Sequence, residues 1–142
     1  GTPLAERGRG PEGWSPLFAG IADADKARQV ADTLQSPDHF NLFLPTPTAA
    51  RSNPGFDPDG YWQGRVWLDQ WYFAIKGLRQ YGFNEQANRL QAQLLTRAQG
   101  LTGADPIREN YHPLTGAQQG ATNFSWSAAV LLDLLSDTPP KN

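Results

Sequence analysis

The sequence of 142 residues contains no cysteine and no methionine. Without cysteine the chain can form neither disulfide bonds nor cysteine-ligated zinc sites. No apolar run approaches the roughly 20 residues that a membrane-spanning helix needs. An excess of charge of one sign is missing too, since 12 basic and 14 acidic residues leave a net charge of −2. This balance disfavours nucleic acid or an anionic membrane as a partner.

What is present is the composition of a globular domain. Apolar residues make up 39% of the sequence and charged residues 18%, whereas disordered chains have fewer apolar residues and more net charge. A chain of this length can bury one hydrophobic core. It opens with Gly1-Thr2-Pro3 and lacks even an initiator methionine, so we expect it to be an internal part of a longer protein.

The spacing of apolar residues predicts two kinds of helix. Residues 23–35 and 85–98 carry one apolar stripe, which is typical of a helix that covers an outer surface. Residues 63–81 and 123–136 are apolar on nearly every face, so each needs neighbours on all sides. A shorter helix is expected at 16–21. Because strand-like alternation of useful length is absent, the sequence predicts an all-α fold of inner and outer antiparallel helices.

Residues at the predicted helix ends support these boundaries. Asp23 is expected to be the N-cap of the first long helix, and Asn84 that of helix 85–98. Gly82 suits the position after the end of helix 63–81, where a left-handed backbone is common.

Two loops rich in proline and glycine, 36–60 and 100–122, are longer than usual connections, and loops of this length are often functional. If consecutive helices run antiparallel, the loops at 10–15, 55–62 and 103–122 leave the same end of the helical layers. We therefore expect these three loops to form one rim.

Aromatic rings, amides, an arginine and one carboxylate gather on this rim, a combination that suits a sugar. The apolar face of a pyranose packs on aromatic rings, while its hydroxyls pair with charged and amide groups. Each signal is weak alone, because a tryptophan at a helix start is more often a core residue and a loop glutamate is usually only solvated. The carboxylate is Glu109, and the candidate sugar contacts are Trp14, Tyr61, Trp62, Arg65, Asn110, Tyr111 and Trp126.

No metal site is predicted. His39 and His112 stand alone in the sequence. Asp57 and Asp59 imitate the first half of a calcium-binding loop, but the position of its closing glutamate is occupied by Leu68.

Three motifs, in this order and at these intervals, resemble the C-terminal third of the catalytic domain of glycoside hydrolase family 63. The first is YWQGRVWLDQWY at 61–72, the second is RENY with PLTG shortly after it within 108–116, and the third is NFSWSA at 123–128. The resemblance extends from Gly13 to about Leu135, and the bacterial α-glucosidases of the family are the nearest match. On this basis residues 1–142 are identified as the C-terminal segment of such a domain.

The resemblance implies a fold and a reaction. The fold is an (α/α)₆ toroid, and the reaction is an inverting hydrolysis of α-glucosidic bonds in oligosaccharides. It assigns Glu109 as the general base, and the neighbouring Arg108 is expected to favour the charged form that a base needs. The general acid of the family, an aspartate, lies upstream of this chain. We therefore expect the segment alone to be inactive and to need the remaining N-terminal part of the enzyme.

The resemblance also has consequences for cofactors and location. It implies a reaction that needs no cofactor, with any structural calcium outside this segment. It implies a periplasmic or secreted enzyme, although the segment itself carries no targeting signal. Linkage preference and oligomeric state are not encoded in these motifs.

Two other interpretations stay open. The chain could be a carbohydrate-binding helical module without chemistry, in which case no second carboxylate faces Glu109 across a cleft. It could also be a helical scaffold, which requires Trp14 and Trp62 to be buried. In every case four or five helices cannot close a ring of twelve, so the all-round apolar helices are expected to expose apolar surface in the isolated chain.

Overall fold

The computed structural model describes residues 8–136, and each of its α-helices overlaps a segment that the sequence predicts to be helical. The helices are α1 Ser15–Phe18, α2 Ala24–Gln35, α3 Leu68–Gln80, α4 Asn84–Arg97 and α5 Ser125–Ser136, and a 3₁₀ turn, Pro11–Gly13, precedes them. Asp23 caps α2 as predicted, because its carboxylate accepts a hydrogen bond from Lys26 N at 2.8 Å. Gly82, with φ +79°, follows α3 as expected. Asn84 is not a cap, since it is the first residue of α4 itself.

The prediction of an all-α fold is wrong, because the described residues also form a three-stranded antiparallel sheet beside the helices. Its strands are β1 Val66–Trp67, β2 Arg108–Tyr111 and β3 Gln118–Thr122, in the order β1-β2-β3. Two strands lie within the predicted loop 100–122, and β1 takes the place of the first turn of the predicted helix 63–81. The strands are two to five residues long, too short for an alternating pattern to stand out, and the pairing of β1 with β2 joins segments about 40 residues apart.

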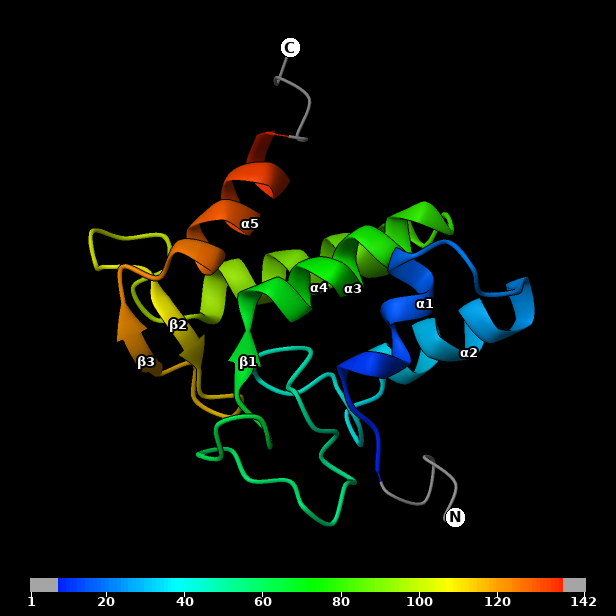
Figure 1. Cartoon of the computed structure of the whole chain (residues 1–142), viewed down its shortest axis with the longest axis horizontal. Coiled ribbons are helices and arrows are strands. Elements are labelled where there is room, and N and C mark those ends of the chain that lie inside the picture. Colours follow the sequence, from blue (N-terminus) through cyan, green and yellow to red (C-terminus); the bar gives the residue numbers. More distant parts are fainter. Residues whose placement is uncertain (1–7, 137–142) are drawn as a thin grey trace.

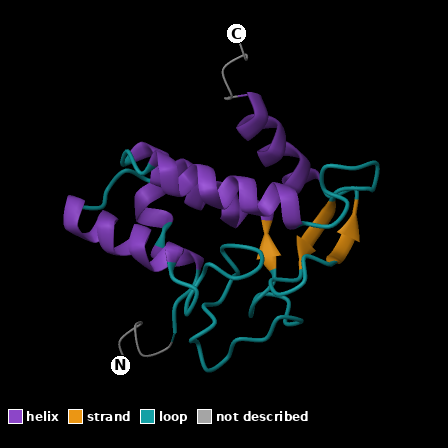
Figure 2. Cartoon of the chain, turned by 180° about the vertical axis from the view of Figure 1, so that it is seen from behind, coloured by secondary structure: helices purple, strands orange, loops and turns teal. Residues whose placement is uncertain are grey.

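Helix α3 is the centre of the molecule, as its all-round apolar pattern predicts. Helices α1, α4 and α5 all pack on it, and of its residues only Gln80 is exposed. Helices α2 and α4 bury a single stripe each, as expected of covering helices. Figures 1 and 2 show α3 and α4 side by side, with α1 and α2 at one end and the sheet at the other.

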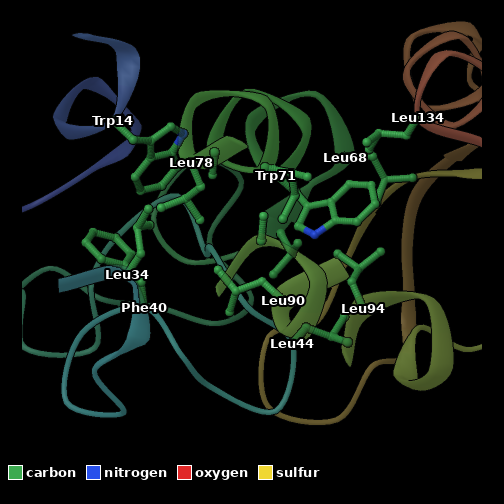
Figure 3. Packing of buried hydrophobic residues seen from close by; sticks show 14 of the residues in the cluster. Trp14, Leu34, Phe40, Leu44, Leu68, Trp71, Leu78, Leu90, Leu94 and Leu134 are labelled. Carbon is green, nitrogen blue, oxygen red and sulfur yellow. The ribbon is translucent and has the colours of Figure 1, made fainter. Parts of the chain in front are cut away.

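Two buried tryptophans, one just before α1 and one in α3, anchor the core (Figure 3). Trp14, just before α1, packs edge-on against Phe40 with ring centroids 5.1 Å apart. Trp71 lies near Leu68, Leu94 and Leu134, so its ring joins α3 to α4 and α5.

Helix α5 is buried on only one face within the described part of the chain. Leu131 and Leu134 are buried, and α5 packs against α3 and β2. Trp126, Leu132 and Leu135 are exposed, although 123–136 is apolar enough for an inner helix. The expected burial on all sides is therefore not met, and the exposed apolar surface expected of an isolated segment is present.

Gly77 sets the distance between α1 and α3. A Cβ at this position would lie 2.8 Å from Leu17 Cβ and 2.9 Å from Phe18 N, so α1 would have to move. We expect Gly77→Ala to lower the free energy of unfolding by up to about 2 kcal/mol, because overpacking costs about 1–3 kcal/mol and improved helix propensity returns about 1 kcal/mol. Urea denaturation measures this. A variant more stable than the parent, as helix propensity alone predicts, would show that α1 is not packed this closely.

Candidate active site

The pairing of β1 with β2 brings the two predicted site segments together. Val66 lies opposite Tyr111, and Trp67 lies opposite Asn110. The turn that precedes β1 therefore meets β2 side by side. As a result Tyr61 and Glu109, which are 48 residues apart in sequence, are in contact.

Glu109 is held by hydrogen bonds to both carboxylate oxygens. Tyr61 donates its hydroxyl hydrogen to Oε1, and the backbone N–H of Ala121 in β3 donates to Oε2 at 3.1 Å. Ser127 Oγ, in the first turn of α5, donates to the backbone carbonyl of Glu109 at 3.4 Å. The side chain is only 8% exposed, so its orientation is fixed by these partners and not by solvent.

A bulge in β3 lies opposite Glu109. Arg108 pairs with Thr122 and Asn110 with Gln119, so one strand advances two residues while the other advances three. Gly120 lies in the bulge with φ +71°, a conformation that favours glycine. The missing side chain leaves room for the carboxylate. Sequence reasoning missed this residue, although a glycine in a short polar stretch is a known sign of a bulge.

Arg65 ties the turn before β1 to Asn110. Its Nε and Nη2 donate to the carbonyl of Asp59 at 3.1 and 2.8 Å, and its Nη1 donates to Asn110 Oδ1 at 3.4 Å. The guanidinium carbon lies 5.8 Å from the centre of the Tyr61 ring. Asn110 is fully buried, and its Nδ2 has no hydrogen-bond partner among the described residues. The structure thus brings Tyr61, Arg65, Glu109 and Asn110 together.

Arg108 hydrogen-bonds to a neighbour other than Glu109. Its Nε donates to Gln118 Oε1 at 3.0 Å, on the neighbouring strand. In residues 8–136 the side-chain donor to the Glu109 carboxylate is the Tyr61 hydroxyl. Adjacent residues of a strand project to opposite faces, which is why nearness in sequence misleads here.

Aromatic rings form a continuous row beside Glu109. Trp62 is 45% exposed and stacks on the buried Trp67, with ring centroids 4.1 Å apart and planes at 14°. The rings of Tyr61 and Phe124 both meet Trp67 edge-on, with centroids 5.1 and 6.2 Å from that of Trp67. Phe124 in turn contacts Trp126, which is 57% exposed. The row therefore has open rings at Tyr61, Trp62 and Trp126.

Trp14 and Tyr111, both predicted sugar contacts, are core residues in the structure. Trp14 is 1% exposed, and its Nε1 donates to the carbonyl of Gln70 at 3.1 Å. Tyr111 is fully buried, and this burial raises the pKa of its hydroxyl. Neither ring is open to a ligand, so both are removed from the candidate site. Trp14 was predicted from its position after a glycine and Tyr111 from its position in a motif. Neither position shows whether a ring packs in the core or binds a ligand.

The N-terminal loop, residues 8–12, nonetheless lies next to the predicted rim. A cavity of about 580 Å³ lies between this loop and the turn before β1, and it is lined by Arg9, Glu12, Asn53, Trp62 and Gln70 among others. The loop reaches the rim through residues 8–12 and not through Trp14.

Two classes of feature are absent from the part of the chain that the structure describes. No group of three or more histidine, aspartate and glutamate side chains is arranged to hold a metal ion. Within residues 8–136, no helix combines the length and apolar character that crossing a membrane requires.

Comparison with known proteins identifies the family. The protein-family model described as the mannosylglycerate hydrolase MGH1-like glycoside hydrolase domain matches residues 1–127 of this sequence. The chain belongs to this domain family, within glycoside hydrolase family 63. The resemblance seen in the three sequence motifs is thereby confirmed.

Relatives cover almost the whole chain, whereas the chain covers a minor part of them. It is 36% identical over 132 residues to the mannosylglycerate hydrolase of Thermus thermophilus, which is 93% of this chain and 30% of the relative. It is 31% identical over 131 residues to the glucosylglycerate hydrolase of Mycolicibacterium hassiacum. This match covers 86% of this chain and 27% of the relative. The crystal structure of a family 63 mannosylglycerate hydrolase from Thermus thermophilus in complex with glucose matches with a TM-score of 0.76 and 33% identity, over 90% of this chain and 31% of that one.

More distant relatives include the periplasmic trehalase of Xanthomonas axonopodis, which is 29% identical over 138 residues, 89% of this chain and 23% of the relative. The name of this relative states a location, and the names of the two hydrolases do not. A periplasmic or secreted location for the present protein stays a prediction.

The hydrogen bond to the Glu109 carboxylate raises the pKa of the Tyr61 hydroxyl above its ordinary value of 10.0, and desolvation adds to this effect. Because the pKa is raised on folding, the associated stability is complete below the unfolded value and is lost as the pH rises through the folded pKa. We expect Glu109→Gln to return the midpoint of one tyrosine towards 10.0, measured by the ultraviolet absorbance of tyrosinate. Tyr61→Phe should delete that titration, and Tyr81→Phe should leave it intact. An unchanged midpoint in Glu109→Gln would contradict the contact.

Proposed function

We propose that this chain is the base-carrying, C-terminal segment of the catalytic domain of an inverting glycoside hydrolase, with Glu109 as the general base. The observation that carries the proposal is the site around Glu109. A nearly buried carboxylate is held at both oxygens beside a row of partly exposed aromatic rings. Membership of a glycoside hydrolase family supports the same chemistry.

In the proposed reaction, Glu109 takes a proton from a water molecule while the water oxygen bonds to the anomeric carbon. The glycosidic bond breaks, and the leaving oxygen receives a proton from a carboxylic acid supplied by the rest of the enzyme. An inverting pair needs about 6.5–9.5 Å between its carboxyl groups so that the water fits between them. The acid is expected upstream of this chain, so we expect the segment alone to be inactive.

The sugar-binding residues in this proposal are Tyr61, Trp62, Arg65, Asn110 and Trp126. Trp62 and Trp126 offer exposed indole faces, the usual platform for the apolar face of a pyranose. Arg65 is already paired with Asn110 and with the carbonyl of Asp59, so these two residues hold the site in shape and can offer a sugar only their remaining donors.

The substrate class we propose is a small glycoside in which a hexose is joined to glycerate. The named relatives hydrolyse mannosylglycerate, glucosylglycerate or trehalose, which favours a short substrate over the α-glucosyl oligosaccharide expected from sequence. A family 63 relative has also been crystallised with D-glycerate together with Tris.

The partner we propose is the remaining N-terminal part of the same enzyme. The chain spans about a third or less of the length of its relatives. The exposed apolar face of α5, with Trp126, Leu132 and Leu135, is a surface that a soluble domain normally covers. Covering by the rest of the enzyme accounts for both observations.

A carbohydrate-binding module without chemistry is the second candidate, because it would use the same exposed rings. The scaffold interpretation is less favoured, since it requires both Trp14 and Trp62 to be buried and Trp62 is 45% exposed. A measurement of catalytic activity distinguishes the glycoside hydrolase from the binding module.

In the complete enzyme, Glu109→Gln should lower kcat by about 10²–10⁴ while KM changes little, because a neutral amide cannot accept the proton of water. Glu85→Gln is the matched control, since Glu85 is an exposed glutamate on α4. The first sugar released from an α-linked substrate should be the β-anomer, observed by NMR. Unchanged kcat in Glu109→Gln would favour the binding module, and release of the α-anomer first would indicate a retaining mechanism.

Substrate preference is tested with mannosylglycerate, glucosylglycerate and trehalose in parallel. We expect kcat/KM for a glycosylglycerate to exceed that for trehalose by more than about 10-fold, because a site that pairs with a carboxylate loses that pairing when the aglycone is neutral. Equal or higher kcat/KM for trehalose would contradict the proposed substrate class.

A further inference from the structure

The carboxylate of Glu109 has two different hydrogen-bond donors, and they differ in rigidity. The donor to Oε2 is a backbone N–H of Ala121 within the sheet, at 3.1 Å. The donor to Oε1 is the hydroxyl of Tyr61, which is half exposed and lies in the turn before β1. Oε2 is therefore paired with fixed backbone, whereas Oε1 is paired with a partly exposed side chain.

The Ala121 donor depends on the bulge at Gly120. A Cβ at position 120 would lie 2.5 Å from Glu109 Oε2 and 2.8 Å from Glu109 Cβ, both closer than real Cβ contacts allow. It would also lie 3.1 Å from Asn110 Nδ2. Gly120 is thus the residue that lets the carboxylate rest against β3.

We propose that Gly120 and Tyr61 are positioning residues for the base, and that Oε1 is the oxygen that accepts the proton. The bulge fixes Oε2 against the backbone, and this turns Oε1 towards the aromatic row. Tyr61 holds Oε1 from the side and leaves its second lone pair for a water molecule. This inference rests on the proposed function, because it assumes that Glu109 is a general base.

The consequence is a coupling between Gly120 and Glu109. A residue that acts only by placing a carboxylate cannot matter once that carboxylate is unable to take a proton. A residue that merely supports the fold matters equally whether position 109 is glutamate or glutamine. The two roles therefore differ in a double-mutant cycle.

The test uses the complete enzyme with a glycosylglycerate substrate. Gly120→Ala should lower kcat by about 10²-fold with little change in KM, since a displacement of about 1 Å of a catalytic group costs this much. Gly82→Ala is the matched control: its φ is also positive, at +79°, but an added Cβ meets nothing within 4 Å. In the Glu109→Gln background, Gly120→Ala should cause no further loss of kcat.

A second pair of variants covers the case in which Gly120→Ala does not fold. Tyr61→Phe should lower kcat by about 10-fold, the usual worth of a hydrogen bond to a charged group, and this loss should vanish in the Glu109→Gln background. Tyr81→Phe is its control, because Tyr81 donates its hydroxyl hydrogen to the carbonyl of Ala22 at 2.8 Å, away from the site.

The outcomes separate this inference from the proposed function. If Glu109→Gln lowers kcat but Gly120→Ala or Tyr61→Phe behaves like its control, the positioning inference is wrong and the general base stands. Equal losses in both backgrounds would also overturn it, since they indicate a structural role. If Glu109→Gln keeps its kcat, the proposed function fails, and the positioning inference fails with it.

Discussion

The pairing of β1 with β2 is the contact on which the candidate site depends. Two residues of one strand and two of the other, Val66 with Tyr111 and Trp67 with Asn110, join segments that are otherwise separated by α3 and α4. Tyr61 reaches Glu109 only because its turn leads into β1. The same pairing buries Trp67, on which Trp62 stacks. A short sheet at the end of a helical domain thus assembles a carboxylate, its hydrogen-bond donors and an aromatic row.

The helices could be predicted from sequence because their signals are local. Apolar periodicity placed α2 and α4 within a residue of their observed ends, and the Asp23 cap and Gly82 were correct. The strands could not be predicted, because a segment such as Gln118–Thr122 carries no alternation and owes its conformation to pairing with another strand. The first turn of the predicted helix 63–81 became β1 for the same reason. Val66 and Trp67 pair with β2 although they fit the helical pattern, and the helix begins at Leu68.

The site was predictable in its residue types and less so in their contacts. Tyr61, Arg65, Glu109 and Asn110 do meet, as expected from loops that form one rim. Trp14 and Tyr111 have the same chemistry as residues that bind sugars, and only their burial shows that they are packing residues. Arg108 was expected to act on Glu109, yet strand geometry directs it to Gln118. Gly120 has no side chain and Ala121 contributes only its backbone N–H, so nothing in their residue types points to the site. Their contacts with Glu109 are seen only in the structure.

The central claim is that Glu109 activates the attacking water, and chemical rescue tests it most directly. Glu109→Ala in the complete enzyme removes the base and leaves space beside the sugar. Azide is a nucleophile that needs no deprotonation, so it can replace the activated water. We expect azide to restore turnover and to give a glycosyl azide of inverted configuration, detected by NMR. Absence of both rescue and azide product, in a variant that still binds substrate, would contradict the assignment of Glu109 as general base.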